Sequence, residues 1–597
     1  MRWPARGEQE RGSPPRRPQD VAHVGEPERD STVRWMQRAL LAAFLVWSLI
    51  EAQVSPRVLF SPEALEGVGR LVRGLFPPDL SPQFLGVVAG AVVRTLAIAV
   101  AGTVLAVVLA IPLGILATPT LFRPGAAAAG NGPLAWLLFL LHLLARGLLR
   151  IFRAVPELLW ALLFVVAVGL GPRAGALALG VAYAGVLGRV VADLLEDVDP
   201  SPGEVLTASG GRRESLVLFA LLPQALPGLV SYGLYSLECA IRSASVLGFV
   251  GAGGLGQELQ LSMRLFEYRQ VSTLLLALLV LMLVGEGMTR LLARIGQSAR
   301  VSGLPPLGAW QRRFLVLGGI AAVVLSFRGV DLLGGADAGL LQRMGRFAAQ
   351  LFPPDLSVAF LASLRVPLLQ TLAVAGAGTL LGVLVAAALA PLASGSLMLL
   401  SPDAPGRRGL AGWVGPPLHV AARALLAVLR GIPELLWVLL CIVAVGFGPF
   451  AGVLALGLHT GGVLGRLWAD ALDEASPAPL EALEASGASA PVRTLWGAWP
   501  QVRALAAGYG LLRWEFNLRV SALVGFLGGG GLGLKLYNAI QLGFYDQVCT
   551  MVLVILCLVM LSDRLSDSVR RRWLAPAALR REWKGTAEAR LEVGLAA

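Results

Sequence analysis

Long apolar runs separated by short polar connections dominate the chain from residue 38 onward. With their flanks the runs are long enough to cross a hydrocarbon core of roughly 30 Å as helices. They form two groups of six: residues 38–54, 84–117, 155–170, 174–195, 224–248 and 270–292, then 313–329, 360–393, 432–447, 451–470, 502–526 and 547–563. Residues 134–152 and 417–430 are amphipathic segments that precede the third run of each half. The pattern leaves open whether they lie in the membrane. The pattern predicts an all-α integral membrane protein with about 12 transmembrane helices.

The two groups of runs are copies of one another. Residues 153–189 and 430–466 align without a gap at an offset of 277 residues, and residues 76–81 recur at 352–357. This period is far longer than a solenoid repeat, so it indicates a duplicated domain. Since each copy has an even number of predicted spans, we expect two parallel, pseudo-symmetric halves.

Composition and charge agree with a membrane location. Of 597 residues 56% are hydrophobic and only 15% are charged, which lies outside the range of soluble proteins. The net charge of +12 comes from arginines before the first run, between the halves and after the last run. The positive-inside rule places these segments and both termini in the cytoplasm. The basic balance therefore reflects membrane topology and lipid contact, and we expect no nucleic-acid partner.

The most polar internal loop of each half lies between its fourth and fifth runs. A glutamate, a glycine six residues later and a proline thirteen residues after that recur in both loops. These residues are Glu204, Gly210 and Pro223 in the first half and Glu481, Gly487 and Pro500 in the second. The spacing predicts a short helix capped by glycine, followed by a second helix. A plain cytoplasmic connector is the alternative, and the second copy at identical spacing disfavours it.

Charged side chains inside the fifth runs are the candidate pathway residues. A charge at mid-bilayer costs about 2.5–3.5 kcal/mol on insertion scales, so such side chains usually face a cavity or a partner. Glu238 and Arg242 are four residues apart, as are Glu515 and Arg519, so each pair can neutralise itself on one helix face. Structural salt bridges and an oxyanion passage lined by the two arginines both remain open.

Several motifs together resemble the phosphonate-type permease family of ABC importers. They are Arg-x-x-Pro-Glu-Leu-Leu-Trp at 153–160 and 430–437, Gly-x-Gly-Pro-x-Ala-Gly at 169–175 and 446–452, the glycine runs at 251–256 and 528–533, and residues 515–519. The two polar loops resemble that family's ATPase-coupling loops. The family's asparagine is present as Asn517 but is Ala240 in the first half, and His459 corresponds to Ala182. The resemblance therefore implies that the two ATPase-coupling loops are alike, whereas the residues of the two halves that line the substrate pathway differ.

The resemblance implies two permeases fused in tandem, in the type I ABC importer (MetI-like) fold. We expect a disordered cytoplasmic tail over 1–33, permease repeats over 34–295 and 313–573, a cytoplasmic junction over 296–312 and a C-terminal tail over 574–597. The implied cargo is phosphonate or a related phosphorus oxyanion. Glu238, Arg242, Glu515, Asn517 and Arg519 would form the pathway. The implied location is the bacterial plasma (inner) membrane, with both termini cytoplasmic.

The resemblance also implies that other subunits supply the energy. The only two lysines, Lys535 and Lys584, are not followed by Ser or Thr, so the chain has no Walker A loop. We expect no catalytic residues, no metal site and no cofactor in this chain, with ATP bound by two cytoplasmic ATPase subunits. An external substrate-binding protein would deliver the cargo. A dinucleotide fingerprint at the glycine runs would need a soluble βαβ unit, so we expect tight re-entrant turns there instead.

Three other functions remain open. Twelve spans in two parallel halves also suit a proton-coupled secondary transporter, which the paired coupling loops disfavour. An ABC permease for another small anion or metabolite would share every motif above. A membrane scaffold without transport activity is disfavoured by the charged residues within the spans.

Overall fold

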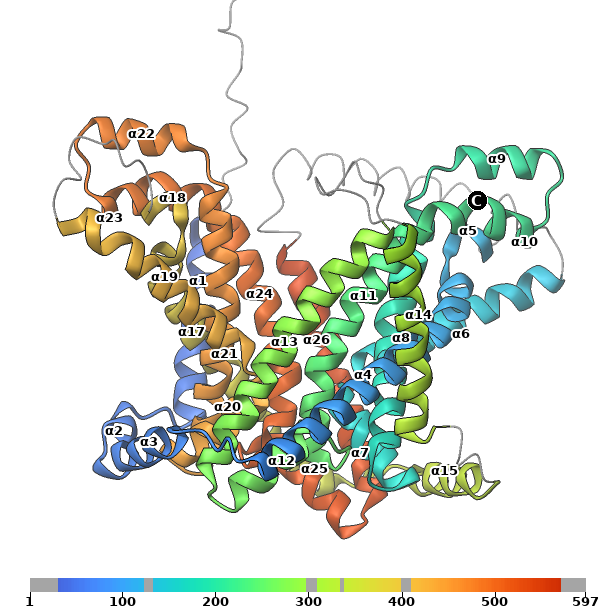
Figure 1. Cartoon of the computed structure of the whole chain (residues 1–597), viewed down its shortest axis with the longest axis horizontal. Coiled ribbons are helices and arrows are strands. Elements are labelled where there is room, and N and C mark those ends of the chain that lie inside the picture. The colour runs from blue at the N-terminus through green and yellow to red at the C-terminus, as the bar shows by residue number, and fades with distance from the viewer. Residues whose placement is uncertain (1–30, 123–132, 297–308, 333–337, 399–409, 571–597) are drawn as a thin grey trace, which may run out of the picture. The chain divides into compact units, whose positions relative to one another are not determined.

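The computed structural model describes residues 31–122, 133–296, 309–332, 338–398 and 410–570 (Figure 1). Most of the predicted tails and of the 296–312 junction therefore lies outside the described residues. The chain divides into two compact units, residues 1–47 and 48–597. In the first unit a helix carries Phe44 and Trp47, whose ring centroids are 5.8 Å apart. The description below concerns the second unit.

The described part of the chain is helical throughout and contains no strand, as the sequence predicts. The first half contains α1 (Ser31–Glu51), α2 (Pro56–Leu59), α3 (Pro62–Leu75), α4 (Pro82–Ala117), α5 (Pro119–Phe122), α6 (Pro133–Ala154), α7 (Glu157–Val168), α8 (Pro172–Glu196), α9 (Ser201–Ala208), α10 (Arg213–Ser215), η1 (Leu216–Leu221), α11 (Leu222–Leu247), η2 (Gly248–Val250), α12 (Leu255–Arg264) and α13 (Tyr268–Gly296). The second half contains α14 (Ala309–Val330), α15 (Ala338–Leu351), α16 (Val358–Ser363), α17 (Arg365–Ala393), α18 (Gly395–Met398), α19 (Leu410–Gly431), α20 (Glu434–Val445), α21 (Pro449–Asp473), α22 (Pro477–Ala485), α23 (Ala490–Val492), η3 (Arg493–Ala498), α24 (Trp499–Val524), η4 (Gly525–Leu527), α25 (Gly531–Leu542) and α26 (Tyr545–Val569).

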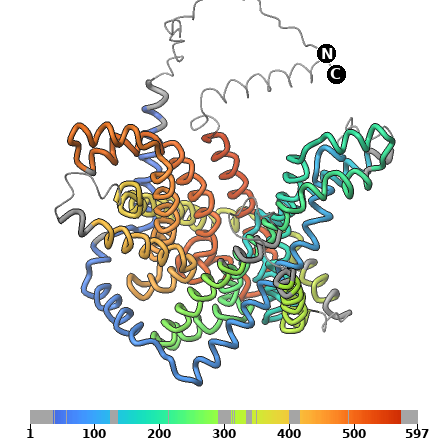
Figure 2. The backbone as a smooth tube through the Cα atoms, turned by 45° about the horizontal axis from the view of Figure 1, so that its top comes forward, coloured from blue at the N-terminus to red at the C-terminus, as the bar shows by residue number. Residues whose placement is uncertain are grey.

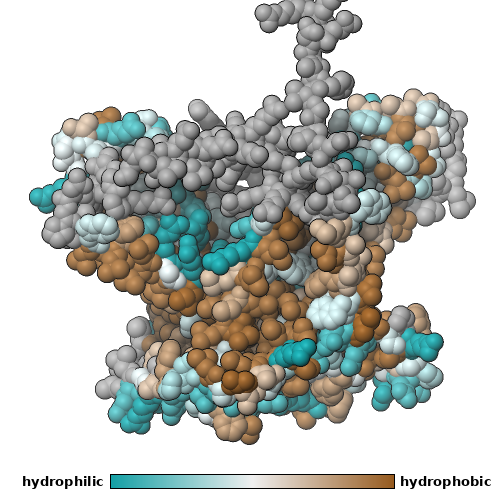
Figure 3. Space-filling model, turned by 180° about the vertical axis from the view of Figure 1, so that it is seen from behind, coloured by the Kyte–Doolittle hydropathy of each residue, from teal (hydrophilic) through white to brown (hydrophobic). Residues whose placement is uncertain are grey.

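Every predicted span corresponds to a helix. Seven helices in the described part are long and apolar enough to cross a membrane, and ten spans result if each of three bent pairs counts as one. Helices α1 and α14 occupy the other two predicted positions. On the face shown in Figure 3, hydrophobic side chains form a broad belt above a hydrophilic lower edge. The chain is a multi-pass membrane protein.

A sharp bend changes the interpretation of two spans. Helices α7 and α20 have 12 residues each, so at 1.5 Å per residue they reach about 18 Å and cannot cross the hydrocarbon core alone. The amphipathic segments are the helices α6 and α19, which meet α7 and α20 at 95° and 98°. Pro156 and Pro433 occupy the N-caps of α7 and α20, where a missing amide hydrogen leaves no helical bond unmade.

A tryptophan holds each bend closed. Trp160 Nε1 donates to the carbonyl of Phe152 at 3.3 Å, and Trp437 Nε1 donates to the carbonyl of Leu429 at 3.1 Å. Both acceptors lie in the last turn of the preceding helix, where carbonyls lack helical partners. The tryptophan of the repeated Pro-Glu-Leu-Leu-Trp motif therefore fixes the bend in both halves.

Small residues let the central helices of each half approach closely. Helix α4 packs along α8, and α17 packs along α21 in the same way. A Cβ at Gly180 would lie 2.5 Å from a methyl carbon of Leu105, and one at Gly457 would lie 2.5 Å from a methyl carbon of Leu381. Close helix packing through small residues is typical of membrane proteins, where lipid supplies no hydrophobic driving force between helices.

The two halves are interlocked. Helix α14, from the second half, packs on α4 of the first half, and Arg173 forms an ion pair with Asp331 just beyond α14. Helix α3 packs on α20, where a Cβ at Gly67 would come 2.6 Å from the carbonyl oxygen of Val443. Its counterpart α15 packs on α7. Several helices therefore contact the half to which they do not belong in sequence.

Candidate functional site

A central cavity of about 470 Å³ lies between the two halves. The first half lines it with residues of the bent pair α6 and α7, of α8 and of α11, and the second half lines it with α20, α21, α24 and the end of α19. The cavity-lining positions on α11 follow one helical face: Tyr232, Tyr235, Ser236, Cys239, Arg242, Ser243 and Val246. The repeated motif thus places its proline bend at the wall of the cavity.

The cavity is strongly basic. Five arginines line it against two glutamates, Glu157 and Glu434. The arginines are Arg153, Arg242, Arg430, Arg513 and Arg519. Arg242 comes from α11 and Arg519 from α24, so the structure brings these two predicted pathway residues to one cavity from opposite halves. Their guanidinium groups give the cavity the chemistry of an oxyanion site.

Several guanidinium nitrogens in this cavity are buried without a protein partner. Arg242 Nε, Arg519 Nε, and both Nε and Nη2 of Arg513 find no hydrogen-bond acceptor within the described part of the chain. Buried polar groups are normally hydrogen-bonded, so each unmatched donor calls for a ligand or water. The guanidinium of Arg513 lies 4.7 Å from the ring centroid of Phe516, which holds its plane in place.

The walls that the two halves contribute differ in chemistry. In the first half Ser243 donates to Glu157 at 3.0 Å and lies 3.2 Å from the hydroxyl of Tyr183. These side chains form one hydrogen-bonded chain along the wall.

The wall from the second half contains a histidine in place of these hydrogen-bonded side chains. His459 Nε2 lies 3.5 Å from the carboxylate of Glu434, and His459 Nδ1 lies 3.0 Å from the carbonyl of Ile432. Since a carbonyl only accepts, Nδ1 carries the proton. The corresponding position in the first half is Ala182. The two walls of the cavity therefore differ in their side chains, and an asymmetric passage stays a prediction.

The predicted pairing of Glu515 with Arg519 is wrong. Glu515 accepts from Arg570 at 2.8 Å, and Arg519 lies 3.8 Å from Asp563. Both partners belong to the last helical segment, α26 and the residue after it. These two ion pairs tie α24 to the last helical segment. Glu238 and Arg242 together line an adjoining cavity of about 260 Å³.

Asn517 lies outside the central cavity. Its side chain is 1% exposed, accepts from Thr460 at 3.0 Å and donates to Thr379 at 2.9 Å. These bonds join α24 to α21 and α17. The substitution by Ala240 in the first half therefore changes helix packing and not the wall of the central cavity.

Three arginines of the cavity were not among the predicted pathway residues. Arg153 and Arg430 open the repeated Arg-x-x-Pro-Glu motif, which supported the resemblance without receiving a role. Arg513 had no motif at all, because Ser236 occupies its position in the first half. Helical phase could have identified it: Arg513, Phe516, Val520 and Leu523 lie three or four residues apart on one face.

A second cavity lies toward the glycine-run end of the molecule. It measures about 370 Å³ and is lined mainly by apolar residues of α7 and η2 and by residues of α12, η4 and α25. Leu158 and Leu435 line both this cavity and the central one, and they are only 2% and 3% exposed. These two leucines are equivalent positions of the repeat, and they are the candidates for an apolar seal between the two cavities.

The glycine runs are tight turns, as predicted. The backbone reverses through Gly251, Gly253 and Gly254, all with positive φ, before α12 begins. A Cβ at Gly256 would lie 2.0 Å from the carbonyl oxygen of Ser245, so no side chain fits there. Thr95 accepts from the amide of Leu255 at 2.9 Å, and Thr371 accepts from that of Leu532 at 3.0 Å.

The two polar loops form helical hairpins on the side of the molecule opposite these turns (Figures 1 and 2). Helices α9 and α22 end at Ala208 and Ala485, and two residues later the chain turns at Gly210 and Gly487, whose φ angles are +80° and +79°. In each loop the glycine and the residue after it donate back to the helix, as in a Schellman cap. The predicted glycine-capped short helices are present in both halves.

The exposed faces of these loops carry the predicted glutamates. Glu204 and Glu481 are exposed on α9 and α22. Near the start of the first loop, hydrogen bonds from the Ser201 hydroxyl and amide lower the pKa of Asp199. In the second loop an ion pair of 2.7 Å between Arg493 and Glu484 joins the two arms of the hairpin.

A π-helix follows each loop and leads into the membrane helix. The π-helices η1 and η3 end just before Pro223 and Pro500. A proline inside a helix cannot donate to the preceding turn and clashes with a carbonyl there, and wider π-helical winding accommodates it. The predicted prolines therefore mark the junction between each loop and the fifth span.

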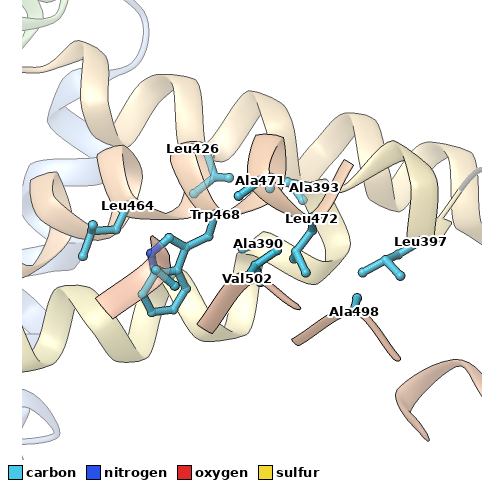
Figure 4. Packing of buried hydrophobic residues seen from close by; sticks show 14 of the residues in the cluster. Ala390, Ala393, Leu397, Leu426, Leu464, Trp468, Ala471, Leu472, Ala498 and Val502 are labelled. Atoms are coloured by element: carbon cyan, nitrogen blue, oxygen red, sulfur yellow. The ribbon is translucent and has the colours of Figure 1, made fainter. Parts of the chain in front are cut away.

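Buried apolar side chains join the second loop to the membrane helices (Figure 4). Leu480 on α22 and Ala498 in η3 belong to a cluster with Leu397, Leu426, Trp468 and Val502 and with further residues of α17, α19 and α21. Helix α22 is therefore packed onto the bundle through Leu480 and is not a free surface loop.

Comparison with known proteins adds a family to this geometry. Residues 125–295 and 409–575 match the family described as binding-protein-dependent transport system inner membrane component. The chain is 31% identical over 525 residues to the phosphate-import permease protein PhnE of Mycolicibacterium smegmatis, covering 86% of this chain and 91% of that protein.

Two further likenesses involve shorter proteins. The phosphite transport system permease protein PtxC of Stutzerimonas stutzeri is 34% identical over 276 residues, which is 45% of this chain and 91% of that protein. A chain of the inward-facing MetNI methionine ABC transporter aligns with 26% identity and a TM-score of 0.32, covering 37% of this chain and all of that chain.

Proposed function

Since the chain belongs to the family of binding-protein-dependent transport system inner membrane components, we propose that it is the permease subunit of an ABC importer for phosphonate or a related phosphorus oxyanion. Both halves of the translocation pathway would lie on this one chain. The observation that carries the proposal is the central cavity, which five arginines line from both halves.

The charges of the cavity favour an anion. An anion about 4 Å from one guanidinium gains about 4 kcal/mol at an effective dielectric constant of 20. The unmatched nitrogens of Arg242, Arg513 and Arg519 are donors of the kind that tetrahedral oxyanions accept. Relatives named for phosphate import and for phosphite transport agree with this cargo class.

We place the energy source on separate subunits. The hairpins of α9 and α22 would each dock one cytoplasmic ATPase subunit, which binds the ATP. An external substrate-binding protein would deliver the cargo on the opposite side, near α12 and α25. Both termini would then be cytoplasmic and the chain would lie in a bacterial inner membrane.

The same geometry suggests how ATP hydrolysis would move the cargo. Closure of the ATPases would push α9 and α22 together, and the packed cluster around Leu480 and Trp468 would pass the movement to α21 and α24. The bent pairs α6–α7 and α19–α20 would then separate Leu158 from Leu435 and open the cavity outward. Such rigid-body switching between two arrangements is the general form of alternating access.

Reconstitution tests the proposal. The chain is placed in proteoliposomes with its ATPase and binding protein, and uptake of labelled phosphate, phosphite and methylphosphonate is measured with and without ATP. We expect ATP-dependent uptake of at least one of these anions, unaffected by a protonophore. Uptake that needs no ATPase and collapses with the proton gradient would instead identify a secondary transporter. ATP-driven uptake of some other solute alone would reject the cargo class.

A further inference from the structure

A second basic cavity lies beside α6, away from the apolar seal. It measures about 420 Å³ and is formed by α6, α8 and the end of α4. Four arginines line it, Arg146, Arg150, Arg153 and Arg189, together with one carboxylate, Asp193. Arg189 donates to Asp193 at 2.9 Å. Neither Arg150 nor Arg153 has an ion pair among the described residues, so these two guanidinium groups give the lining its excess positive charge.

The equivalent positions of the second half carry one arginine fewer. Arg466 donates to Asp470 at 2.9 Å, just as Arg189 does to Asp193. Ala427 stands where the first half has Arg150. Arg150 therefore has no counterpart in the second half. It forms no ion pair with any of the described residues.

An apolar surface continues from this cavity along α6. A neighbouring cavity of about 350 Å³ shares Arg146 and Arg150 with it and is otherwise lined by residues that include Phe139 and Leu143. Leu143 and Leu144 are 50% and 59% exposed. A basic end joined to an apolar groove is the arrangement that an amphiphile with an anionic head fits.

We propose that this cavity of α6 and α8 binds a phosphate-type group. The group belongs to the headgroup of an anionic phospholipid or to a free phosphorus oxyanion, and the guanidinium groups of Arg150, Arg153 and Arg189 hold it. Guanidinium forks suit tetrahedral phosphate oxygens in either case. The site is distinct from the central cavity, with which it shares only Arg153 among these arginines.

The full-length chain, purified in detergent and freed of lipid, is titrated with two probes. One arm adds phosphatidylglycerol, with phosphatidylcholine as the neutral comparison, and counts bound lipids by native mass spectrometry. The other arm adds inorganic phosphate and measures heat by calorimetry, with every protein carrying Arg513→Gln so that the central cavity contributes less. Elution profile and thermal unfolding check that each variant is folded.

Arg189→Gln is compared with Arg466→Gln, because each loses the same ion pair within one helix. We expect Arg189→Gln to weaken binding of at least one probe by about tenfold, and Arg466→Gln to change it less than twofold. Arg150→Gln, which breaks no ion pair among the described residues, should weaken the same probe. The arm that responds identifies lipid or free oxyanion as the source. Equal weakening by both glutamine variants, or no effect of either first-half variant, would overturn the proposal.

Discussion

Arg513 is the residue that distinguishes the two cavity walls most sharply. It lines the central cavity, rests against Phe516 and keeps two nitrogens unmatched in the described part of the chain. Its equivalent, Ser236, can donate only one hydrogen bond. At this pair of equivalent positions the second half therefore supplies more hydrogen-bond donors, and the only positive charge, for binding an anion.

Arg513→Gln tests that role. Loss of one buried charge-assisted contact costs about 1.5–3 kcal/mol, so we expect the Kd for the anion inside the cavity, or the KM of uptake, to rise at least tenfold. The measurement is ATP-driven uptake in proteoliposomes. Arg503→Gln, on an exposed position of the same helix, is the control and should leave uptake unchanged; an equal loss in both variants would contradict the assignment.

Leu158 and Leu435 should act as the seal between the two cavities. Leu158→Ser with Leu435→Ser replaces apolar surface by hydroxyls that water can solvate, so we expect passive leakage of phosphate through the chain in the absence of ATPase. Efflux from preloaded proteoliposomes measures it.

Leu159→Ser is the matched control for the seal. Leu159 is equally buried, at 1% exposure, but lines neither cavity. It should destabilise the protein comparably without a leak. Leakage through the control, or tight vesicles with the double variant, would locate the seal elsewhere.

At the residue scale the sequence predicted some positions correctly and misread others. Arg242 and Arg519 could be found because a charge in an apolar run is costly. Their partners could not, because Asp563 and Arg570 lie on another helix and only the packing of α24 against α26 brings them near. Asn517 was selected from a motif, and a motif does not reveal which way a side chain faces.

At the scale of elements, the hairpins of α9 and α22 depend on one backbone conformation each. Gly487 has positive φ and open space where a Cβ would be, so its requirement is conformational and not steric. A left-handed conformation costs a residue with a Cβ roughly 1–2 kcal/mol. The cap geometry therefore depends on glycine at this position.

Gly487→Val should loosen the coupling hairpin while leaving the bundle folded. We expect ATP hydrolysis by the associated ATPase to persist while uptake per ATP falls several-fold, measured as the ratio of the two rates. Gly510→Val is the control, since Gly510 lies in α24 with no positive φ and no neighbour within 4 Å of a Cβ. An unchanged ratio for Gly487→Val would remove the hairpin from the coupling path.

Element positions followed from hydrophobic patterning, but their angles did not. Each apolar run became a helix because nothing else satisfies the backbone in lipid. The 95° and 98° bends before α7 and α20 depend on Pro156 and Pro433 together with the tryptophan bonds across the bend. A proline in a run signals a break without its direction, so two half-length helices were counted as full spans.

At the scale of the whole molecule, we expect the contacts between the halves to hold without the connecting peptide. Helix α14 packs on α4, α3 on α20, and α15 on α7. Co-expression of residues 1–302 and 303–597 as separate chains should yield a complex that elutes at the position of the intact protein. The readout is co-purification through a tag on one piece, and recovery of the tagged piece alone would show that the linkage is essential.

The sequence repeat predicted the helices of each half but not the packing of helices from one half against the other. Equivalent threonines, glycines and tryptophans make equivalent bonds in both halves, so an aligned repeat predicts local geometry well. Which half a helix contacts depends on how its connection crosses the molecule, and a repeat is silent on that. The boundary between sequence halves, near residues 296–312, is consequently not a boundary of packing.

The differing cavity walls have a consequence for how such a protein changes over time. In an assembly of two identical chains, any substitution alters both walls at once. A change that is beneficial in one wall is therefore also present in the other wall. Here the wall with Tyr183 and Ser243 and the wall with His459 and Glu434 are encoded separately. A substitution can therefore change one wall while the other wall keeps its affinity for the original cargo. Single substitutions can then give access to a wider range of cargoes.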